Sequence, residues 1–457
     1  MNKYDVLIIG GGISGISAAK HLVDNNKRVC LIESNSKIGG RVNSRIDKNS
    51  LDSIDNGQHV LMGVYYNFLK LLKDIDTYKY LQISKGLNFL IKDKSNTYRL
   101  NTSKYFGKLG LLVGILNFNI LTKKEKYKTI VFLFNVKYHN IETEDLSCKE
   151  LLSIHNQDKN VSKYLWTPFI ESTLNTKIEL ASADIFVNII KMIFWGKKGA
   201  TDFIVPKVSL NNLIEPAVKY IENRGGKINF NSTMKEFIYN SDKSENKSNK
   251  NIVGIKTVKG NEFYSDAIIM ALPINKLELL RTMQYNSVIN SVNISNILNN
   301  FKYSSIISIY VWLDKKVMNE NIIQLIDFNI QWIFNKKYFS SVELTTQSEY
   351  SKDLLSMTIS AADNLINIGN EELKLLFTNE LLEVFPDLSL QDIIQMKIIK
   401  EKRATFLCSN ENEIFRNEIG KNFGEIIFAG DWVNNKLPST IEGACINGIN
   451  AAKLCMI

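Results

Sequence analysis

The fold is decided by the stretch YDVLIIGGGISG at residues 4–15. Its first half, residues 4–9, has the length and apolar character of a buried strand. Residues 16–25 then carry apolar side chains at helical spacing, and residues 28–33 (RVCLIE) form a second apolar run that ends in an acid. The order of strand, glycine-rich turn, helix and strand predicts an α/β dinucleotide-binding unit.

The motif glycines and the acid have separate tasks in such a unit. Gly10 permits the tight turn off the strand, and Gly12 lets the backbone approach a pyrophosphate. Gly15 lets the helix pack closely on the sheet, so that the free N–H groups of the helix N-terminus face the phosphates. Glu33 closes the second strand, where a carboxylate binds ribose hydroxyls and disfavours a 2′-phosphate.

Gly39-Gly40-Arg41 follows soon after this unit. At that distance the tripeptide resembles the second signature of the amine-oxidase/phytoene-desaturase flavoprotein superfamily. The resemblance implies FAD in place of NAD, with Gly40 and Arg41 at the pyrophosphate and the backbone of Met234 against the adenine. It also implies an α/β fold in which a Rossmann-like FAD-binding domain of the amine-oxidase type carries a discontinuous α+β substrate domain.

A third piece lies further along, FAGDW at residues 428–432 and LPSTIEGA at residues 437–444. Ser439 and Glu442 have the spacing of a capping box that opens a final helix. The N-terminus of that helix would direct its partial positive charge toward the edge of the flavin that becomes anionic on reduction. The residues expected at the cofactor here are Gly430, Asp431, Ile441 and Glu442.

These signatures divide the chain into two interleaved domains. We expect an FAD-binding domain from residues 1–66, 205–275 and 395–457, and a substrate-binding domain from residues 67–204 and 276–394. Residues 234–239 and 252–258 are predicted to form paired strands, and the polar stretch at 240–251 between them a solvated loop.

Several less common motifs point to one branch of the superfamily. They are DNGQH at 55–59 with Gly63 and Tyr65, TP at 167–168, LNT at 174–176, VPKV at 205–208, IQW at 330–332 and KEKRATF at 400–406. They resemble the hydroxysqualene dehydroxylases, also described as squalene-associated FAD-dependent desaturases, and the resemblance runs from residue 4 to about 453. The segments 433–436 and 240–251 depart from that pattern, and neither holds a residue assigned to chemistry.

The resemblance implies reductive removal of the hydroxyl of hydroxysqualene to give squalene, a hopanoid precursor, with FADH2 as the hydride donor. Such a reaction needs an apolar tunnel and a proton donor for the leaving hydroxyl. His59 is the first candidate because histidine titrates near neutrality, with Asp55 beside it and Glu171 or Arg403 as possible assistants. Two alternatives stay open: the loop only shapes the site and binds cofactor through Gly57 and Gln58, or Arg403 is a structural ion-pair partner.

The composition narrows the partners and the compartment. The 457 residues carry 56 Lys+Arg against 47 Asp+Glu, a formal charge of +9. No zinc-ligand spacing and no aromatic-rich RNA-binding signature accompanies that charge, so we expect no metal site and no nucleic-acid partner. Five scattered cysteines indicate a reducing cytoplasm. No signal peptide and no apolar run near the roughly 20 residues of a spanning helix occurs in the sequence.

Residues 105–118 (YFGKLGLLVGILNF), followed by the lysines at 123–128, have two interpretations. In one they touch the inner face of the cytoplasmic membrane, with apolar residues in the acyl region and lysines at anionic headgroups. In the other they form a core helix that lines the cavity for an isoprenoid lipid substrate. An association with prenyl synthases is also possible on functional grounds.

Three other functions remain open. A carotenoid or phytoene-type desaturase would use the same fold in the oxidative direction. A flavin amine oxidase fits less well, because no aromatic substrate cage can be located. A non-catalytic flavin- or isoprenoid-binding protein is opposed by the intact glycines together with Glu33, Arg41 and Asp431.

Overall fold

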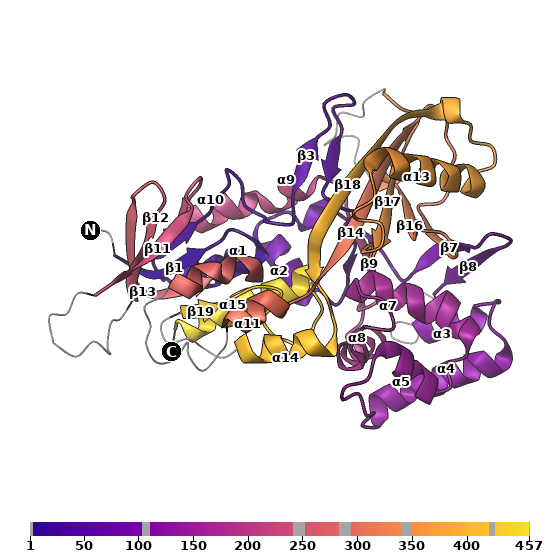
Figure 1. Cartoon of the computed structure of the whole chain (residues 1–457), viewed down its shortest axis with the longest axis horizontal. Coiled ribbons are helices and arrows are strands. Elements are labelled where there is room, and N and C mark those ends of the chain that lie inside the picture. Colours follow the sequence, from indigo (N-terminus) through magenta and orange to yellow (C-terminus); the bar gives the residue numbers. More distant parts are fainter. Residues whose placement is uncertain are drawn as a thin grey trace.

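The computed structural model describes residues 3–102, 110–240, 252–282, 294–339, 350–419 and 426–456. Two seven-stranded sheets organise this part of the chain, one in each half of the long axis in Figure 1. The first sheet carries the glycine-rich turn, and the second faces a group of helices.

The first sheet has a parallel core that gathers segments far apart in the sequence. The parallel strands are β1 (Lys3–Ile9), β2 (Val29–Ile32), β10 (Lys227–Asn229), β13 (Glu262–Met270) and β19 (Ile426–Phe428). β11 (Met234–Tyr239) and β12 (Ile252–Thr257) extend it as an antiparallel pair on β13. The apolar strands of the sequence analysis are thereby confirmed as strands of an α/β sheet.

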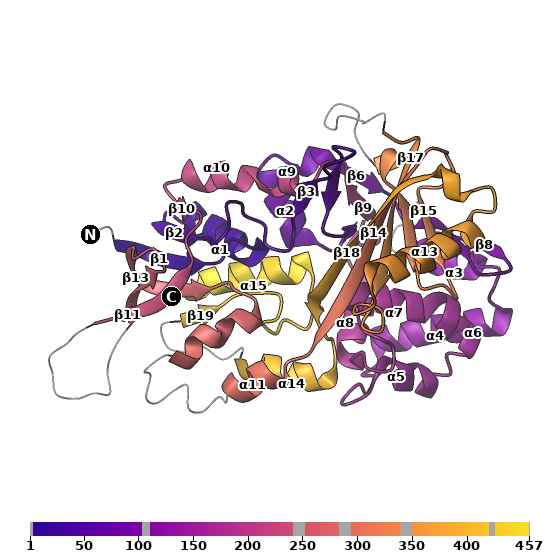
Figure 2. The same ribbon diagram turned by 45° about the horizontal axis from the view of Figure 1, so that its top comes forward.

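Helices gather on one face of this sheet, the face that carries Val6, Ile8, Val29 and Leu31. They are α1 (Ile13–Asp24), α2 (Tyr66–Asp74), α9 (Leu210–Ile214), α10 (Pro216–Glu222) and α15 (Ile441–Leu454). α1 and α15 lie side by side in Figures 1 and 2. Their backbones meet at Gly448, where an added Cβ would lie 2.1 Å from the carbonyl oxygen of Ser14. Ser14 Oγ donates to the carbonyl oxygen of Ala444 at 2.8 Å, which ties the last helix to the first.

The second sheet has the order β18-β14-β17-β16-β15-β7-β8. Its strands are β7 (Asn88–Lys92), β8 (Thr97–Asn101), β14 (Tyr303–Leu313), β15 (Ile322–Leu325), β16 (Trp332–Asn335), β17 (Asp353–Ser360) and β18 (Ile393–Phe406). α13 (Asn370–Val384) crosses one face (Figure 1) and buries Leu373, Phe377 and Leu381 against it.

A group of helices lies beside the second sheet, at the end of the molecule away from β11 and β12 (Figures 1 and 2). It comprises α3 (Gly110–Asn117), α4 (Lys123–Tyr138), α5 (Cys148–Ile154), α6 (Lys159–Val161), α7 (Thr167–Leu174) and α8 (Ala183–Trp195). The remaining elements are short: β3 (Ser44–Ile46) with β4 (Ser53–Asp55), β5 (Leu61–Met62), β6 (Leu81–Ser84) and β9 (Phe203–Pro206), α11 (Ile294–Asn300), α12 (Lys336–Phe339) and α14 (Asn410–Ile419).

The division into two domains stays a prediction, and its boundary at residue 395 falls inside a strand of the second sheet. β18 pairs along its length with β14 in the second sheet, although the expected boundary at residue 395 assigns most of this strand to the FAD-binding domain. Its alternating side chains pack on both faces of that sheet, which local sequence does not reveal. The paired strands on either side of residues 240–251 are confirmed, while the loop itself lies outside the described residues from position 241 onward.

Candidate functional site

The glycine-rich turn has the geometry that its sequence predicts. Gly10 has a φ of +109°, and an added Cβ would lie 2.5 Å from the carbonyl oxygen of Ala271. A Cβ on Gly15 would lie only 1.9 Å from the carbonyl oxygen of Gly10, whereas one on Gly12 would meet nothing within 4 Å. No side chain caps α1 at Gly12. The N-terminus of α1 therefore faces open space with its amides available to an anion.

Glu33 stands beside this turn and is held in place by backbone amides. Its Oε2 accepts from the amide of Gly11 at 2.7 Å, and its Oε1 accepts from the amide of Asn35 at 2.7 Å. The amide of Ser232 donates to the carbonyl oxygen of Glu33 at 2.9 Å, shortly before β11 begins at the buried Met234. The structure thus brings Glu33 and Met234 to the same end of the first sheet.

Arg41 and Asp431 form an ion pair, with Arg41 Nη2 at 2.5 Å from Asp431 Oδ1. Burial by itself would raise the pKa of Asp431, but the Arg41 charge and hydrogen bonds from Arg41 and Ser439 outweigh it and hold that pKa below its usual range. Arg41 is 43% exposed while Asp431 is 7% exposed. Gly40, with a φ of +61°, would place a Cβ 3.3 Å from the Cα of Gly12. The second and third signatures therefore meet at the turn.

The predicted capping box at Ser439 and Glu442 is wrong. Thr440 is the N-cap of α15 and accepts from the amide of Gly443 at 3.1 Å. Ser439 Oγ instead donates to Asp431, and Glu442 accepts from the amides of Asn67 and Phe68 at 3.0 and 2.9 Å. Both side chains thus bond to residues distant in sequence, and Glu442 caps the N-terminus of α2. Ile441 is the first residue of α15.

The loop at residues 55–59 follows β4 and lies against β14 of the second sheet. Asp55 is buried, and its carboxylate accepts from Ser44 Oγ at 2.6 Å and from the amide of Leu210 at 3.2 Å, with Lys336 Nζ at 3.4 Å. Its carbonyl oxygen accepts from Tyr310 OH in the second sheet at 3.1 Å. These contacts give Asp55 an anchoring role in the loop.

His59 is partly buried, and its Nδ1 lies 2.9 Å from the carbonyl oxygen of Gly57. A carbonyl can only accept, so Nδ1 carries the proton and Nε2 is left for another partner. The pKa of His59 is lowered, mainly through burial of the side chain, and the positive charges of Lys336 and Arg41 lower it further. The hydrogen bond to Gly57 and the negative charge of Asp55 raise it, but by less. The influence of Arg41 connects this loop electrostatically with the glycine turn.

Three buried polar atoms around this loop have no hydrogen-bond partner among the described residues. They are Asn56 Oδ1, Gln58 Oε1 and Ser308 Oγ. A Cβ on Gly57 would lie 3.2 Å from Ser308 Oγ, so the loop and β14 are in close contact. A buried polar atom without a partner costs about 1–3 kcal/mol. Such atoms are expected where a polar ligand completes the site.

Arg403 lies on β18 of the second sheet, whereas Glu171 lies on α7. Arg403 is exposed, with its guanidinium 5.5 Å from the ring centre of Tyr303, and it forms no ion pair among the described residues. Burial raises the pKa of Glu171 although Lys177 opposes this at 3.1 Å. Glu171 lines a cavity of about 620 Å³ between α5, α7 and β15, together with Pro168, Gln331 and Trp332.

Comparison with known proteins decides the family. The family described as flavin containing amine oxidoreductase matches residues 13–456. The chain belongs to this family. A hydroxysqualene dehydroxylase from Zymomonas mobilis subsp. mobilis is 25% identical over 98% of this chain and 98% of its own length. A 15-cis-phytoene desaturase from Synechococcus elongatus is 23% identical over 97% of this chain and 94% of its own length.

Solved structures show the same fold at low identity. An oxidoreductase from Methanosarcina mazei covers 98% of this chain and 100% of its own, with a TM-score of 0.70 and 14% identity. Putrescine oxidase with bound putrescine covers 100% of this chain and 99% of its own, with a TM-score of 0.69 and 12% identity. These likenesses bear on the fold alone.

As a member of the flavin amine oxidoreductases, the chain is an FAD-dependent oxidoreductase. The residues fit the cofactor: an uncapped helix N-terminus and an open Gly12 suit a pyrophosphate, and the orphaned polar atoms near Gln58 suit a flavin ring. No helix in the described part of the chain combines the length and the apolar character needed to cross a bilayer.

Three of the less common motifs, LNT, IQW and KEKRATF, contribute side chains to one polar network. Asn175 ends α7 with a φ of +48°, and its side chain accepts from the amide of Ala361 at 2.7 Å and donates to Thr405 Oγ1 at 2.9 Å. Gln331 Nε2 donates to Glu171 Oε2 at 3.0 Å, and Gln331 Oε1 accepts from the amide of Ser360 at 2.8 Å. These motifs therefore join α7 to three strands of the second sheet.

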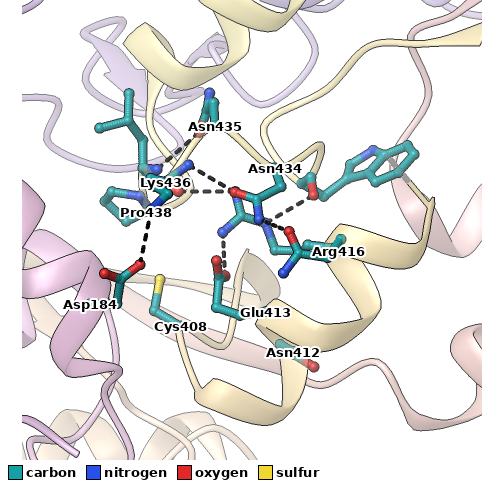
Figure 3. A network of polar contacts seen from close by, with 12 residues as sticks. Asp184, Cys408, Asn412, Glu413, Arg416, Asn434, Asn435, Lys436 and Pro438 are labelled. Atoms are coloured by element: carbon teal, nitrogen blue, oxygen red, sulfur yellow. Dashed lines mark hydrogen bonds and ion pairs between the residues drawn. The ribbon is translucent and has the colours of Figure 1, made fainter. Parts of the chain in front are cut away.

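Arg416 is a residue of the site region that the sequence analysis did not select. It is fully buried on α14 and pairs with Glu413, as Figure 3 shows. Its guanidinium donates to the carbonyl oxygens of Trp432 at 3.0 Å and Leu437 at 3.1 Å. Arg416 thus holds the loop between Asp431 and Ser439. The local signal in the sequence that could have identified it is the i,i+3 spacing of Glu413 and Arg416.

Proposed function

We propose that the chain removes the hydroxyl of hydroxysqualene reductively and forms squalene. The observation that carries this proposal is the orientation of His59, whose Nδ1 is committed to Gly57 and whose Nε2 is left for another group. The similarity to a hydroxysqualene dehydroxylase over nearly the whole of both chains supports it. Loss of a hydroxyl as water requires a proton donor at the oxygen, whereas desaturation requires a proton acceptor at a substrate carbon.

The balance of the reaction assigns two tasks. When bound, FADH2 would supply the hydride to the allylic carbon and would release one proton as it becomes FAD, which offsets the proton consumed at the leaving hydroxyl. The carbon–oxygen bond breaks, and the hydroxyl leaves as water after it receives a proton. The chain must therefore deliver one proton at the oxygen, and it must keep other water away from the carbon that becomes electron-poor.

Protonated His59 can deliver that proton from Nε2. Its Nδ1–H bond to Gly57 fixes the ring plane, and the buried carboxylate of Asp55 stabilises the positive ring, as its opposition to the lowered pKa indicates. Asp55 acts here as a positioning residue, because Ser44 and Leu210 already occupy its Oδ1.

Glu171 is the second candidate for the proton donor. Its raised pKa favours the neutral acid, and it faces the cavity shared with Gln331 and Trp332. Its ion pair with Lys177 works in the opposite direction. Arg403 is exposed, and its guanidinium offers several N–H donors and no acceptor, so it is better suited to binding an anionic group than to proton transfer.

The alternative is desaturation of a phytoene-type isoprenoid, which the similarity to a 15-cis-phytoene desaturase supports. The two reactions run in opposite redox directions. Anaerobic incubation of the enzyme with reduced FAD and hydroxysqualene, and separately with oxidised FAD and phytoene, distinguishes them by product. Squalene in the first incubation supports the proposal, whereas a dehydrogenated polyene in the second, without squalene in the first, refutes it.

A further inference from the structure

The outer face of α4 carries an apolar stripe that the fold leaves uncovered. Tyr127, Val131, Phe134 and Tyr138 are 70%, 37%, 39% and 62% exposed. Their spacing places them on one side of the helix, while Phe132, Leu133 and Val136 on the other side are buried in the core. The helix therefore has apolar side chains on both sides, although packing on the core requires them on only one side.

α8 extends this stripe into an ordered aromatic cluster. The ring of Trp195 lies 5.4 Å from that of Phe134 and 6.4 Å from that of Tyr138, and the latter two stack at 6.0 Å. Trp195 Nε1 donates to the carbonyl oxygen of Leu133 at 3.3 Å. We call Tyr127, Val131, Phe134, Tyr138 and Trp195 the α4 patch. Tyrosine and tryptophan rings of this kind are enriched at the interface between lipid and water.

The exposed charged side chains of α4 are all lysines. Lys123, Lys124 and Lys137 are exposed, and none of them forms an ion pair within the described ranges. Lys137 Nζ lies 4.1 Å from the ring centre of Trp195 and 4.5 Å from that of Tyr138. The only acid of the helix, Glu125, is buried and bonded to the amide of Thr122. An apolar face bordered by lysines is complementary to an anionic lipid surface.

We propose that the α4 patch docks the protein on the surface of an anionic lipid bilayer. The patch lies in the helical group beside the second sheet, away from the first sheet (Figures 1 and 2). The described part of the apolar segment at 105–118 is mostly buried, with Leu111, Leu112 and Ile115 in the core. One of the two interpretations of that segment places a membrane contact there, whereas our proposal places the contact on the next helix; residues 103–109 lie outside the described ranges.

The proposal is independent of which isoprenoid is converted, and flotation of the FAD-loaded protein with vesicles tests it. We expect binding to vesicles of equimolar phosphatidylcholine and phosphatidylglycerol, much weaker binding to phosphatidylcholine alone, and loss of binding at high salt. Lys123→Gln/Lys124→Gln/Lys137→Gln should weaken partitioning by about a hundredfold, since each lysine near an anionic surface contributes about fivefold. Phe134→Ser/Tyr138→Ser should weaken it by more than about tenfold.

Matched variants control for charge and for surface apolarity. Lys219→Gln/Lys235→Gln/Lys259→Gln removes the same charge from the first sheet and its helices, and Leu375→Ser/Leu390→Ser removes two exposed apolar side chains elsewhere. Both controls should partition like the unaltered protein. Bound-flavin absorbance and Tm should stay unchanged in every variant, because all the altered side chains are at the surface.

Two results overturn the proposal. One is the absence of vesicle binding through the patch, seen either as no binding by the unaltered protein or as equal partitioning of the patch variants and their controls. The other is a dimer in light scattering that Phe134→Ser/Tyr138→Ser dissociates in the absence of lipid, which would make the α4 patch an interface between two copies.

Discussion

The glycine turn and the loop at residues 55–59 are built in opposite ways. At the turn, polar side chains are satisfied inside the protein: Glu33 accepts backbone amides, and Asp431 pairs with Arg41. At the loop, Asn56, Gln58 and Ser308 leave buried polar atoms without a partner in the described chain. The polar side chains of the turn are thus already partnered before any ligand binds, whereas those of the loop leave atoms that a ligand would have to satisfy.

The largest effect on activity is expected from a substitution in the loop at residues 55–59. His59→Gln keeps a polar side chain but cannot carry the proton, so kcat should fall by about 10²- to 10⁴-fold, while FAD affinity should change little. Rapid-mixing kinetics of dehydroxylation and flavin titration measure the two effects.

The pH profile gives the same test in the unaltered enzyme. Because the pKa of His59 is lowered, the protonated ring is lost as pH rises through that lowered value. The rate should therefore be level at low pH and fall above it, and this limb should vanish in His59→Gln. The same shift means that His59 reduces folding stability as pH falls through its ordinary pKa. An identical profile in the variant would remove His59 from the mechanism.

The second largest effect is expected at the turn, where two glycines differ. Gly15→Ala forces a Cβ against the carbonyl oxygen of Gly10 and should lower the free energy of unfolding by about 3 kcal/mol. Gly12→Ala meets no protein atom, so it should leave the Tm of the FAD-free protein unchanged and weaken FAD binding. Thermal unfolding of both variants with and without FAD distinguishes the loss of stability from the loss of FAD binding. Equal losses of Tm in both variants would contradict the account.

Arg41→Met tests the ion pair at the turn. It removes charged hydrogen bonds and leaves the buried Asp431 without its cation, so FAD affinity should fall roughly tenfold to a hundredfold, by about 1.5–3 kcal/mol. Arg28→Met, in the exposed pair with Asp5, is the matched control and should bind FAD normally. Calorimetric titration with FAD measures both, and equal affinities would exclude Arg41 from the site.

The smallest effect is expected in the polar network behind the loop. Asn175→Gly keeps the positive φ but removes the amide that links Ala361 and Thr405, so unfolding should become about 1–2 kcal/mol easier. Asn156→Gly, at an exposed position with a φ of +53°, controls for the added flexibility. Denaturant unfolding compares the two. A loss of FAD affinity in Asn175→Gly would show that the network reaches the cofactor directly.

The sequence predicted the first sheet well for a physical reason. Its strands are short, continuous apolar runs, and the demands on Gly10 and Gly15 arise within a few residues of chain. The fold class and FAD followed from these local requirements and from the superfamily signatures. The prediction of a capping box at Ser439 and Glu442 was wrong although it too rested on a local spacing. Asp431 binds the side chain of Ser439, and the amides of α2 bind that of Glu442.

The loop and the second sheet were less predictable because their contacts join distant segments. Residues far apart in sequence determine the position of β18 and the hydrogen bond between Asn175 and Thr405. The same holds for the hydrogen bonds from Arg416 to the loop after Asp431. The motif resemblance located Asn175 and Gln331 without explaining them. Their task became visible only once α7, β16 and β18 were placed together.

Transfer of a hydride from flavin to the substrate carbon is the central claim, and one isotope measurement tests it directly. The enzyme is loaded with 5-deaza-FAD, reduced with deuterium at the position that does not exchange with solvent, and mixed anaerobically with hydroxysqualene in ordinary water. A parallel reaction with reduced FAD verifies turnover. The account predicts squalene that carries the deuterium. Unlabelled squalene, or no squalene in the parallel reaction, would contradict it.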